Sequence, residues 1–132
     1  MSWTFQQSNG WILRPDGTLE GRGYSGHGNG KNNPNFQQVA DVGPIPRGIY
    51  RIGDPIEHPL LGGYVIPLKP DPGNQMFERS DFFIHGDSDV HPGEASKGCV
   101  VLALVYREDI VKSGDRGFEV VDGWDNNRAI SA

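Results

Sequence analysis

A histidine and the only cysteine of the chain stand fourteen residues apart, each at one end of an apolar segment. Apolar residues occupy 82–84 directly before His85, and another apolar run follows Cys99 as far as Leu102. The residues between the two segments are rich in Gly, Asp, Ser and Pro, which is typical of an exposed loop. The spacing therefore predicts that two rigid elements, joined by a loop, bring an imidazole beside a thiol.

This pair of residue types is suited to nucleophilic catalysis. A free thiol has a pKa of about 8.5 and needs a basic or cationic neighbour before it becomes a thiolate. We expect His85 to be that base and Cys99 to attack a carbonyl carbon. Gly98 allows a substrate to approach the main chain, so the backbone N–H groups of Gly98 and Cys99 are the expected oxyanion donors. The second ring nitrogen of His85 needs an orienting partner, and the nearby side chain that could be this partner is the Asp87 carboxylate.

Four short motifs resemble known families. The His-Gly pair at 85–86, followed by a loop and Ser-Lys-Gly-Cys at 96–99, is similar to the catalytic motif of L,D-transpeptidases. Tyr-Ser-Gly at 24–26 and Gly-Pro-Ile-Pro-Arg-Gly-Ile-Tyr at 43–50 resemble the smaller, transpeptidase-like Tlde1 family of type VI secretion effectors. The resemblance extends over roughly residues 10–121, which is most of the chain.

The resemblance implies a fold, a substrate and partners. It implies the L,D-transpeptidase catalytic β-domain, with the Gly86 carbonyl in place of a carboxylate as the orienting partner of His85. The implied substrate is the peptidoglycan stem tetrapeptide, cut between diaminopimelate and the terminal D-alanine, or modified by exchange of that D-amino acid. The implied partners are a type VI secretion apparatus, which delivers the protein to a target-cell periplasm, and a cognate immunity protein. No cofactor is implied.

The sequence departs from the common transpeptidase motif at two positions. That motif has a His between the Ser and the Gly, and an Arg two residues after the Cys. This chain has Lys97 and Val101 there, which argues against the usual cross-linking activity but leaves the Cys–His pair intact.

Several polar residues near these motifs are expected to contact the substrate. Arg79 has the forked donors that grip a carboxylate, although an ion pair with Glu78 or Asp81 at the surface is the alternative. The full set of expected substrate-contact residues is Tyr24, Ser25, Arg79, Asp87, Ser96 and Lys97.

Two other classes of function remain open. On an extended strand, alternate residues share a face, so four residues between 85 and 91 offer a rival metal site for a metal-dependent hydrolase. The interleaved Gly and Ser, and the Pro-Gly that follows, favour a loop instead. A non-catalytic domain that binds cell-wall peptide is the third class, and it would not need both the Cys and the His. The four possible metal ligands are His85, Asp87, Asp89 and His91.

Composition sets limits on the class of protein. With 132 residues and a single Cys, we expect one domain over 1–132 without an internal disulfide. The net charge of −5 argues against nucleic acid as a partner, and no apolar run reaches the length of a membrane span. The first six residues lack a basic region followed by an apolar core, so we expect synthesis in the cytoplasm without a secretory signal.

Apolar periodicity, with 19 Gly and 10 Pro, predicts a mainly β fold: a small barrel or sandwich with one helix and long loops. A Pro-Asp-Gly turn at 15–17 predicts a hairpin over 3–20. The Gly-Pro-Ile-Pro corner at 43–46 is expected to be structural only. Further strands are expected at 39–42, 48–52, 63–68, 82–85 and 117–121, a helix at about 104–113 that stops at Gly114, loops at 21–38 and 70–81, and a loose tail from 124 to 132.

Overall fold

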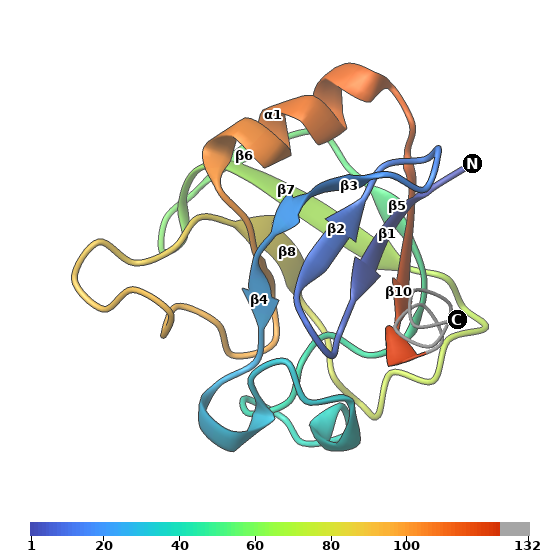
Figure 1. The fold of residues 1–132 in the computed structure, drawn as a ribbon. Helices are drawn as coiled ribbons and strands as arrows, with labels where there is room; N and C mark the ends of the chain where they lie inside the picture. The colour runs from blue at the N-terminus through green and yellow to red at the C-terminus, as the bar shows by residue number, and fades with distance from the viewer. Residues whose placement is uncertain (125–132) are drawn as a thin grey trace.

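The computed structural model describes residues 1–124, in which a curled β-sheet encloses an apolar core and one helix lies across an end of it (Figure 1). The mainly β fold with a single helix and long loops is therefore confirmed. The strands are β1 (Trp3–Gln6), β2 (Trp11–Leu13), β3 (Leu19–Arg22), β4 (Tyr24–Ser25), β5 (Gly48–Ile52), β6 (Ile56–His58), β7 (Gly62–Pro70), β8 (Phe82–His85), β9 (Val100–Val101) and β10 (Gly117–Val121), and the helix is α1 (Leu104–Ser113).

The sheet is mixed, and its strand order is β3-β2-β1-β10-β5-β7-β8-β9-β4, with β6 paired to β7 outside this order. Two pairs are parallel, β1 with β10 and β8 with β9, and the other pairs are antiparallel. The first and last strands of the order, β3 and β4, are separated along the chain by Gly23 alone. This connection requires the sheet to curl until its two ends approach each other, as in a barrel.

Gly23 makes the bend at which the two ends of the sheet approach. Its N–H donates to the Gly10 carbonyl at 2.7 Å, while β4 pairs with β9 through Tyr24 and Val101. A Cβ at position 23 would overlap the carbonyl oxygen of Val101. A residue without a side chain is therefore needed where the chain leaves one end of the sheet for the other.

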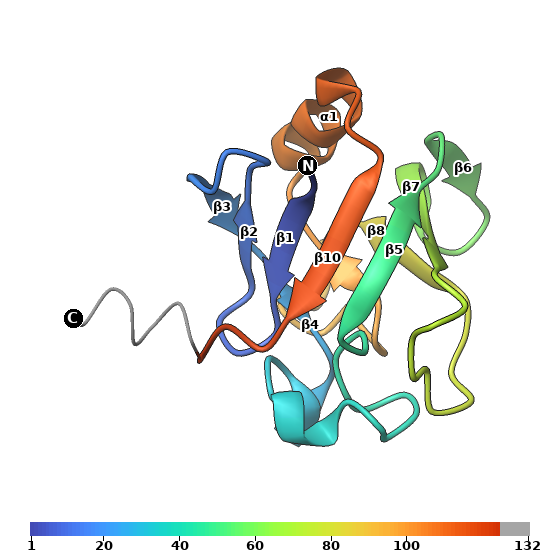
Figure 2. The ribbon, with the colours of Figure 1, turned by 90° about the vertical axis from the view of Figure 1, so that its right-hand side faces the viewer.

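Alternating side chains of the strands fill the interior of the curled sheet. In Figure 2, β2, β1, β10 and β5 stand side by side, and their inward residues are seven of the fifteen residues of the buried apolar cluster. Tyr50 and Phe118 meet edge to face there, with ring centroids 6.4 Å apart. The buried apolar cluster contains Trp3, Phe5, Ile12, Ile45, Tyr50, Ile52, Ile66, Leu68, Phe82, Ile84, Val100, Leu102, Ile110, Phe118 and Val120.

The helix α1 has the predicted bounds, and the chain leaves it at Gly114 in the left-handed conformation. Ile110 packs into the core, and the Trp3 indole N–H donates to the Ser113 hydroxyl at 3.0 Å. These contacts hold the helix against the core and against the first residue of β1. The part of the chain that the structure describes has no helix long and apolar enough to span a membrane.

Three local expectations are corrected. The strand expected at 39–42 is a turn, because the N–H groups of Val42 and Gly43 both bond the Val39 carbonyl and Asp41 adopts a positive φ of 63°. The stretch 21–38 is not a plain loop, since it contains the end of β3, β4 and two short 3₁₀ helices, and β6 was not expected. The hairpin and the strands at 48–52, 82–85 and 117–121 are confirmed, and 63–68 lies within the longer β7. Of the tail, 125–132 lies outside the described residues.

We predict that Gly23→Ala lowers the free energy of unfolding by about 1–3 kcal/mol, because the new methyl group has no room beside the Val101 carbonyl. Urea unfolding followed by tryptophan fluorescence measures the change. Gly73→Ala is the matched control, since its Cβ would meet only the flexible Asp71 carboxylate. Equal stabilities of the two variants would show that the bend at Gly23 does not constrain the sheet.

Candidate active site

Strands β8 and β9 bring the segments of the histidine and the cysteine together. The two strands are parallel, with Ile84 opposite Val100 and His85 opposite Val101, and Cys99 directly precedes β9. Ile84 and Val100 point into the core. His85 follows Ile84 in β8, so its side chain projects from the opposite face of that strand. The predicted juxtaposition of the two strands is thus present.

The His85 ring is oriented by its own following residue. The side chain is 2 % exposed, and Nδ1 lies 2.8 Å from the Gly86 carbonyl oxygen. A carbonyl can only accept, so Nδ1 carries the hydrogen and Nε2 is left as the acceptor. Burial lowers the pKa of His85 below its ordinary value and the Arg107 guanidinium lowers it further, against the opposing effect of the Gly86 carbonyl. Of the two orienting partners considered, Gly86 makes the contact.

The Cys99 thiol is partly buried, and its Sγ atom donates to the Asp81 carbonyl at 3.7 Å. Within residues 1–124, no hydrogen bond joins this thiol to the His85 ring. Burial raises the pKa of the Cys99 thiol, while the Phe83 N–H and the Arg79 guanidinium act in the opposite direction. These shifts favour a neutral imidazole and a neutral thiol near pH 7.

A pocket of about 390 Å³ opens beside Cys99. Three of its acidic residues, Asp41, Glu78 and Asp81, have positive φ values of 63°, 60° and 65°, which are costly for residues with a side chain. Sequence patterns gave no signal for these carboxylates, because they lie in turns without periodicity. The pocket is lined by Ala40, Asp41, Glu78, Arg79, Ser80, Asp81, Phe82, Lys97 and Cys99.

Two of the six expected substrate-contact residues, Arg79 and Lys97, line this pocket. Lys97 is exposed, whereas Arg79 is buried and donates to three backbone carbonyls. The surface ion pair considered for Arg79 is not formed with Glu78 or Asp81 in the described part of the chain. Both cations remain available to an anionic group of a substrate.

Ser96 is fully buried and supports the turn that carries the cysteine. Its hydroxyl donates to the Cys99 carbonyl at 2.6 Å and accepts from the N–H groups of Gly26 at 2.9 Å and Gly98 at 3.0 Å. The expected substrate contact of Ser96 is therefore replaced by a positioning contact. The Gly98 N–H, one of the two expected oxyanion donors, is already engaged.

Ser25 has the same kind of role from the neighbouring strand β4. Its side chain is 0 % exposed, and its hydroxyl donates to the Gly98 carbonyl at 2.9 Å and accepts from the Ile45 N–H at 2.8 Å. No donor or acceptor of this hydroxyl is directed at the pocket. The sequence placed Ser25 near the site but could not distinguish a support residue from a contact residue.

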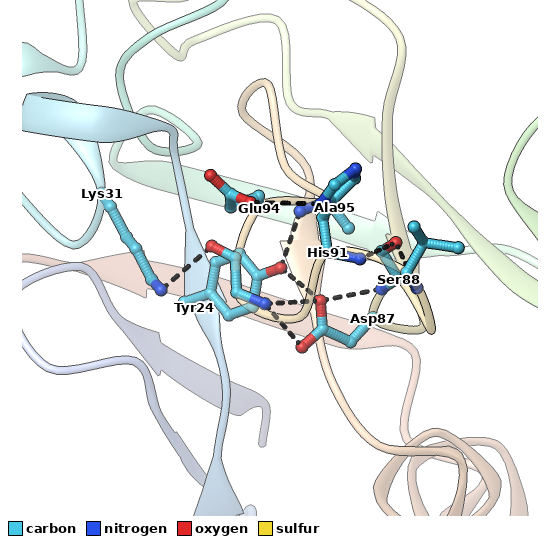
Figure 3. Close-up of polar contacts among 9 residues, drawn as sticks. Tyr24, Lys31, Asp87, Ser88, His91, Glu94 and Ala95 are labelled. Atoms are coloured by element: carbon cyan, nitrogen blue, oxygen red, sulfur yellow. Dashed lines mark hydrogen bonds and ion pairs between the residues drawn. The ribbon is translucent and has the colours of Figure 1, made fainter.

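Tyr24 and Asp87 anchor the loop between the two strands (Figure 3). The Tyr24 hydroxyl donates to Asp87 at 2.6 Å and accepts from the Ala95 N–H at 2.9 Å, and Asp87 also accepts from the Gly93 N–H at 3.0 Å. Lys31 lies over the Tyr24 ring, 4.3 Å from its centroid, and donates to the Gly93 carbonyl at 3.0 Å. Burial, together with the Asp87 carboxylate, raises the pKa of Tyr24 to about 12. The two residues hold the loop in place, away from the pocket that borders Cys99.

The rival metal site is not assembled in the described residues. No group of three or more His, Cys, Asp or Glu side chains within 1–124 has the arrangement of a metal site. His85 faces Gly86, Asp87 bonds Tyr24, and His91 lies 3.8 Å from Glu94. The alternation of these residues in the sequence does not become a shared face, because they follow a loop.

Comparison with known protein families gives one match: the family model described as the Tlde1 domain covers residues 20–116. The matched segment includes β4, the pocket residues, the loop between β8 and β9, and the helix. No match is found among curated proteins or solved structures.

We predict that Ser96→Ala costs about 1–3 kcal/mol of stability, because it leaves the Gly26 and Gly98 N–H groups and the Cys99 carbonyl without their partner. Thermal unfolding of the variant measures the loss. Ser80→Ala serves as a control, since Ser80 lines the pocket from an exposed position. An Ser96→Ala variant as stable as the wild type would contradict the support role.

Proposed function

Since this chain belongs to the Tlde1 domain family of type VI secretion effectors, we propose that it is a cysteine enzyme acting on peptidoglycan stem peptides. The proposal is supported by the pairing of β8 with β9, which joins the strand that ends at His85 to the strand that directly follows Cys99, and by the pocket with cationic and anionic side chains that Cys99 lines. The orientation of His85 by Gly86 supports it, since Nε2 is left free to accept a proton.

In the proposed reaction, His85 Nε2 takes the thiol proton and the Cys99 sulfur bonds to the carbonyl carbon of the scissile amide. The carbonyl π electrons move to oxygen and form an oxyanion. When the intermediate collapses, the C–N bond breaks, His85 returns the proton to the leaving amine, and a thioester remains on Cys99. Water then releases the acid, giving carboxypeptidase activity, or a D-amino acid amine takes its place, giving exchange.

The charges of the pocket support a zwitterionic substrate segment. Lys97 supplies an exposed cation, while Asp41, Glu78 and Asp81 supply carboxylates within the same pocket. Diaminopimelate in a stem peptide carries a free amine and a free carboxylate beside the amide to D-alanine. We therefore propose cleavage between diaminopimelate and the terminal D-alanine of the tetrapeptide.

Membership of the family indicates a type VI secretion apparatus as a partner and delivery to a target cell. Because peptidoglycan lies in the periplasm of such a cell, we propose that the enzyme acts there. A cognate immunity protein in the producing cell is part of the same proposal, since neighbouring producers inject the protein into one another.

We predict that Cys99→Ala, Cys99→Ser and His85→Ala each lower turnover by about 10³-fold or more, because a nucleophile and its base act as one unit. Serine fails because its hydroxyl is far less acidic than a thiol. The measurement is release of D-alanine from purified tetrapeptide muropeptides by mass spectrometry, with thermal melts as a check on folding.

Asp89→Asn and His91→Gln are the matched controls for that experiment. They remove two of the rival metal ligands from exposed positions of the same loop, and we expect both to keep wild-type release. Near wild-type release by Cys99→Ala would refute the cysteine mechanism. Loss in the two loop variants, with recovery on addition of zinc, would favour the metal-dependent hydrolase.

We also predict the position of the acid limb of the pH profile. Only neutral His85 can accept a proton, and burial holds its pKa below the ordinary value of about 6.5. The kcat/KM for D-alanine release should thus rise with pH to a plateau, with a midpoint below pH 6.5. Steady-state rates between pH 4 and 8 measure it, and a midpoint clearly above 6.5 would exclude a desolvated His85 as the base.

A further inference from the structure

Arg79 is a buried cation held in place by the main chain. Its side chain is 8 % exposed, and Nη1 donates to the carbonyls of Gln37 at 2.6 Å and Pro44 at 2.8 Å. Nη2 donates to the Gly43 carbonyl at 3.0 Å, and the guanidinium lies over the Phe82 ring, 5.3 Å from its centroid. The group is thereby fixed in position on several sides.

A contribution to folding stability does not explain why Arg79 is buried. Arg79 forms no ion pair with a carboxylate within the described residues, although Asp41 is near enough to act on it electrostatically. Removing a charge from water without a paired counter-charge costs several kcal/mol. Neutral carbonyls occupy three of the five N–H donors, so two donors of a buried cation are left for another group.

Nη2 of Arg79 lies against the turn that carries the cysteine. Arg79 Nη2 occupies the space that a Cβ on Gly98 would need, and Gly98 has a φ of +130° that favours glycine. Arg79 and Cys99 line the same pocket, and the cation and the thiol interact electrostatically. Glycine at position 98 thus lets a guanidinium lie against the residue that precedes the nucleophile.

A donor is also missing from the expected oxyanion site, because the Gly98 N–H is bonded to Ser96. We propose that Arg79 is a further catalytic residue, whose guanidinium stabilises the Cys99 thiolate and then the oxyanion formed on the substrate carbonyl. This rests on the proposed cysteine mechanism and assigns Arg79 to the reacting atoms rather than to a substrate carboxylate.

The proposal gives the Gly-Pro-Ile-Pro corner a chemical role. Gly43 and Pro44 provide two of the three carbonyls that hold Arg79, and Gln37 provides the third. The Gln37 side chain in turn accepts from the Gln7 amide at 3.1 Å and from the Arg47 N–H at 2.9 Å. Under this proposal the corner positions the cation, a role that the sequence analysis did not assign to it.

The first experiment measures the thiol without any substrate. The pH dependence of Cys99 alkylation by iodoacetamide gives the thiol pKa in the folded wild type and in Arg79→Met. Loss of the neighbouring cation should move the midpoint up by about one pH unit or more. Arg107→Met is the matched control, because Arg107 is also buried and donates to three carbonyls but does not line the pocket. An equal midpoint in Arg79→Met and wild type would overturn the proposal.

A second measurement uses the wild-type fold, in case Arg79→Met does not fold. A cation beside the thiol favours the anionic reagent iodoacetate over neutral iodoacetamide. The ratio of the two alkylation rates should be higher in the folded protein than in the urea-unfolded chain, and it should stay higher in Lys97→Met. A ratio that is no higher in the folded protein, or that falls to the unfolded value in Lys97→Met, would show that Arg79 does not act on the sulfur.

Kinetics distinguish an oxyanion donor from a substrate grip. Arg79→Met and Arg79→Lys should lower kcat for D-alanine release by about 10²–10³-fold with little change in KM. A rise in KM at unchanged kcat would assign Arg79 to substrate binding and overturn the proposal. If the wild type releases no D-alanine, the proposed function fails, while the two alkylation experiments still decide whether Arg79 acts on the thiol.

Discussion

Strands β8 and β9 run parallel, and this pairing constrains everything around the candidate site. Parallel strands need a long crossover connection, which in most folds is a helix. Here the crossover is the loop 86–99, which has no regular hydrogen-bond ladder of its own. Its backbone groups must be satisfied by side chains, and Ser96, Ser25 and the Tyr24–Asp87 pair meet this need. The geometry of Cys99 is therefore set by residues that never reach the pocket.

The two residues of the candidate site differ in their exposure to solvent. His85 is buried beside Arg107 and the strands, so its proton affinity is lowered by desolvation and by a like charge. Cys99 stands at the border of the charged pocket, where Arg79 opposes the effect of burial on the thiol. In the proposed reaction, a substrate that fills the pocket removes water from the thiol while the proposed base, His85, is already neutral. The two reactive groups are thus prepared by different surroundings.

The strands and the helix that could be predicted are those with a clear pattern of apolar residues within their own segment. Alternating apolar residues in 48–52, 82–85 and 117–121, and the helix before Gly114, were predicted because periodicity reports burial directly. The two-residue strands β4 and β9 are too short to show a period. The segment 39–42 resembled a strand because it contains several apolar residues. It forms a turn instead, since main-chain N–H groups bond the carbonyl three and four positions back, an interaction that the pattern of side chains does not reveal.

Motif and spacing placed His85 at the end of a strand and Cys99 before the next one, as the structure has them, and their catalytic roles stay a prediction. The contacts of the other polar residues could not be predicted. Ser25 and Ser96 have the composition of contact residues, and only their burial shows that they support the turn. Arg79 was expected near a substrate, yet its position depends on carbonyls from Gln37 to Pro44, far away in the chain. Contacts of this kind cannot be predicted from residue types, because every residue has a main-chain carbonyl.

The parallel pairing of β1 with β10 places Trp3 opposite Phe118, residues at nearly opposite ends of the described chain. Contacts between such distant segments form slowly, because the whole intervening chain must be closed into a loop first. During synthesis, β1 has no β10 to pair with until the last strand has left the ribosome. The core, and with it the support of the thiol, can be completed only then. A truncated chain that ends before Gly117 would lack the strand that lies between β1 and β5 and would remain without a continuous sheet.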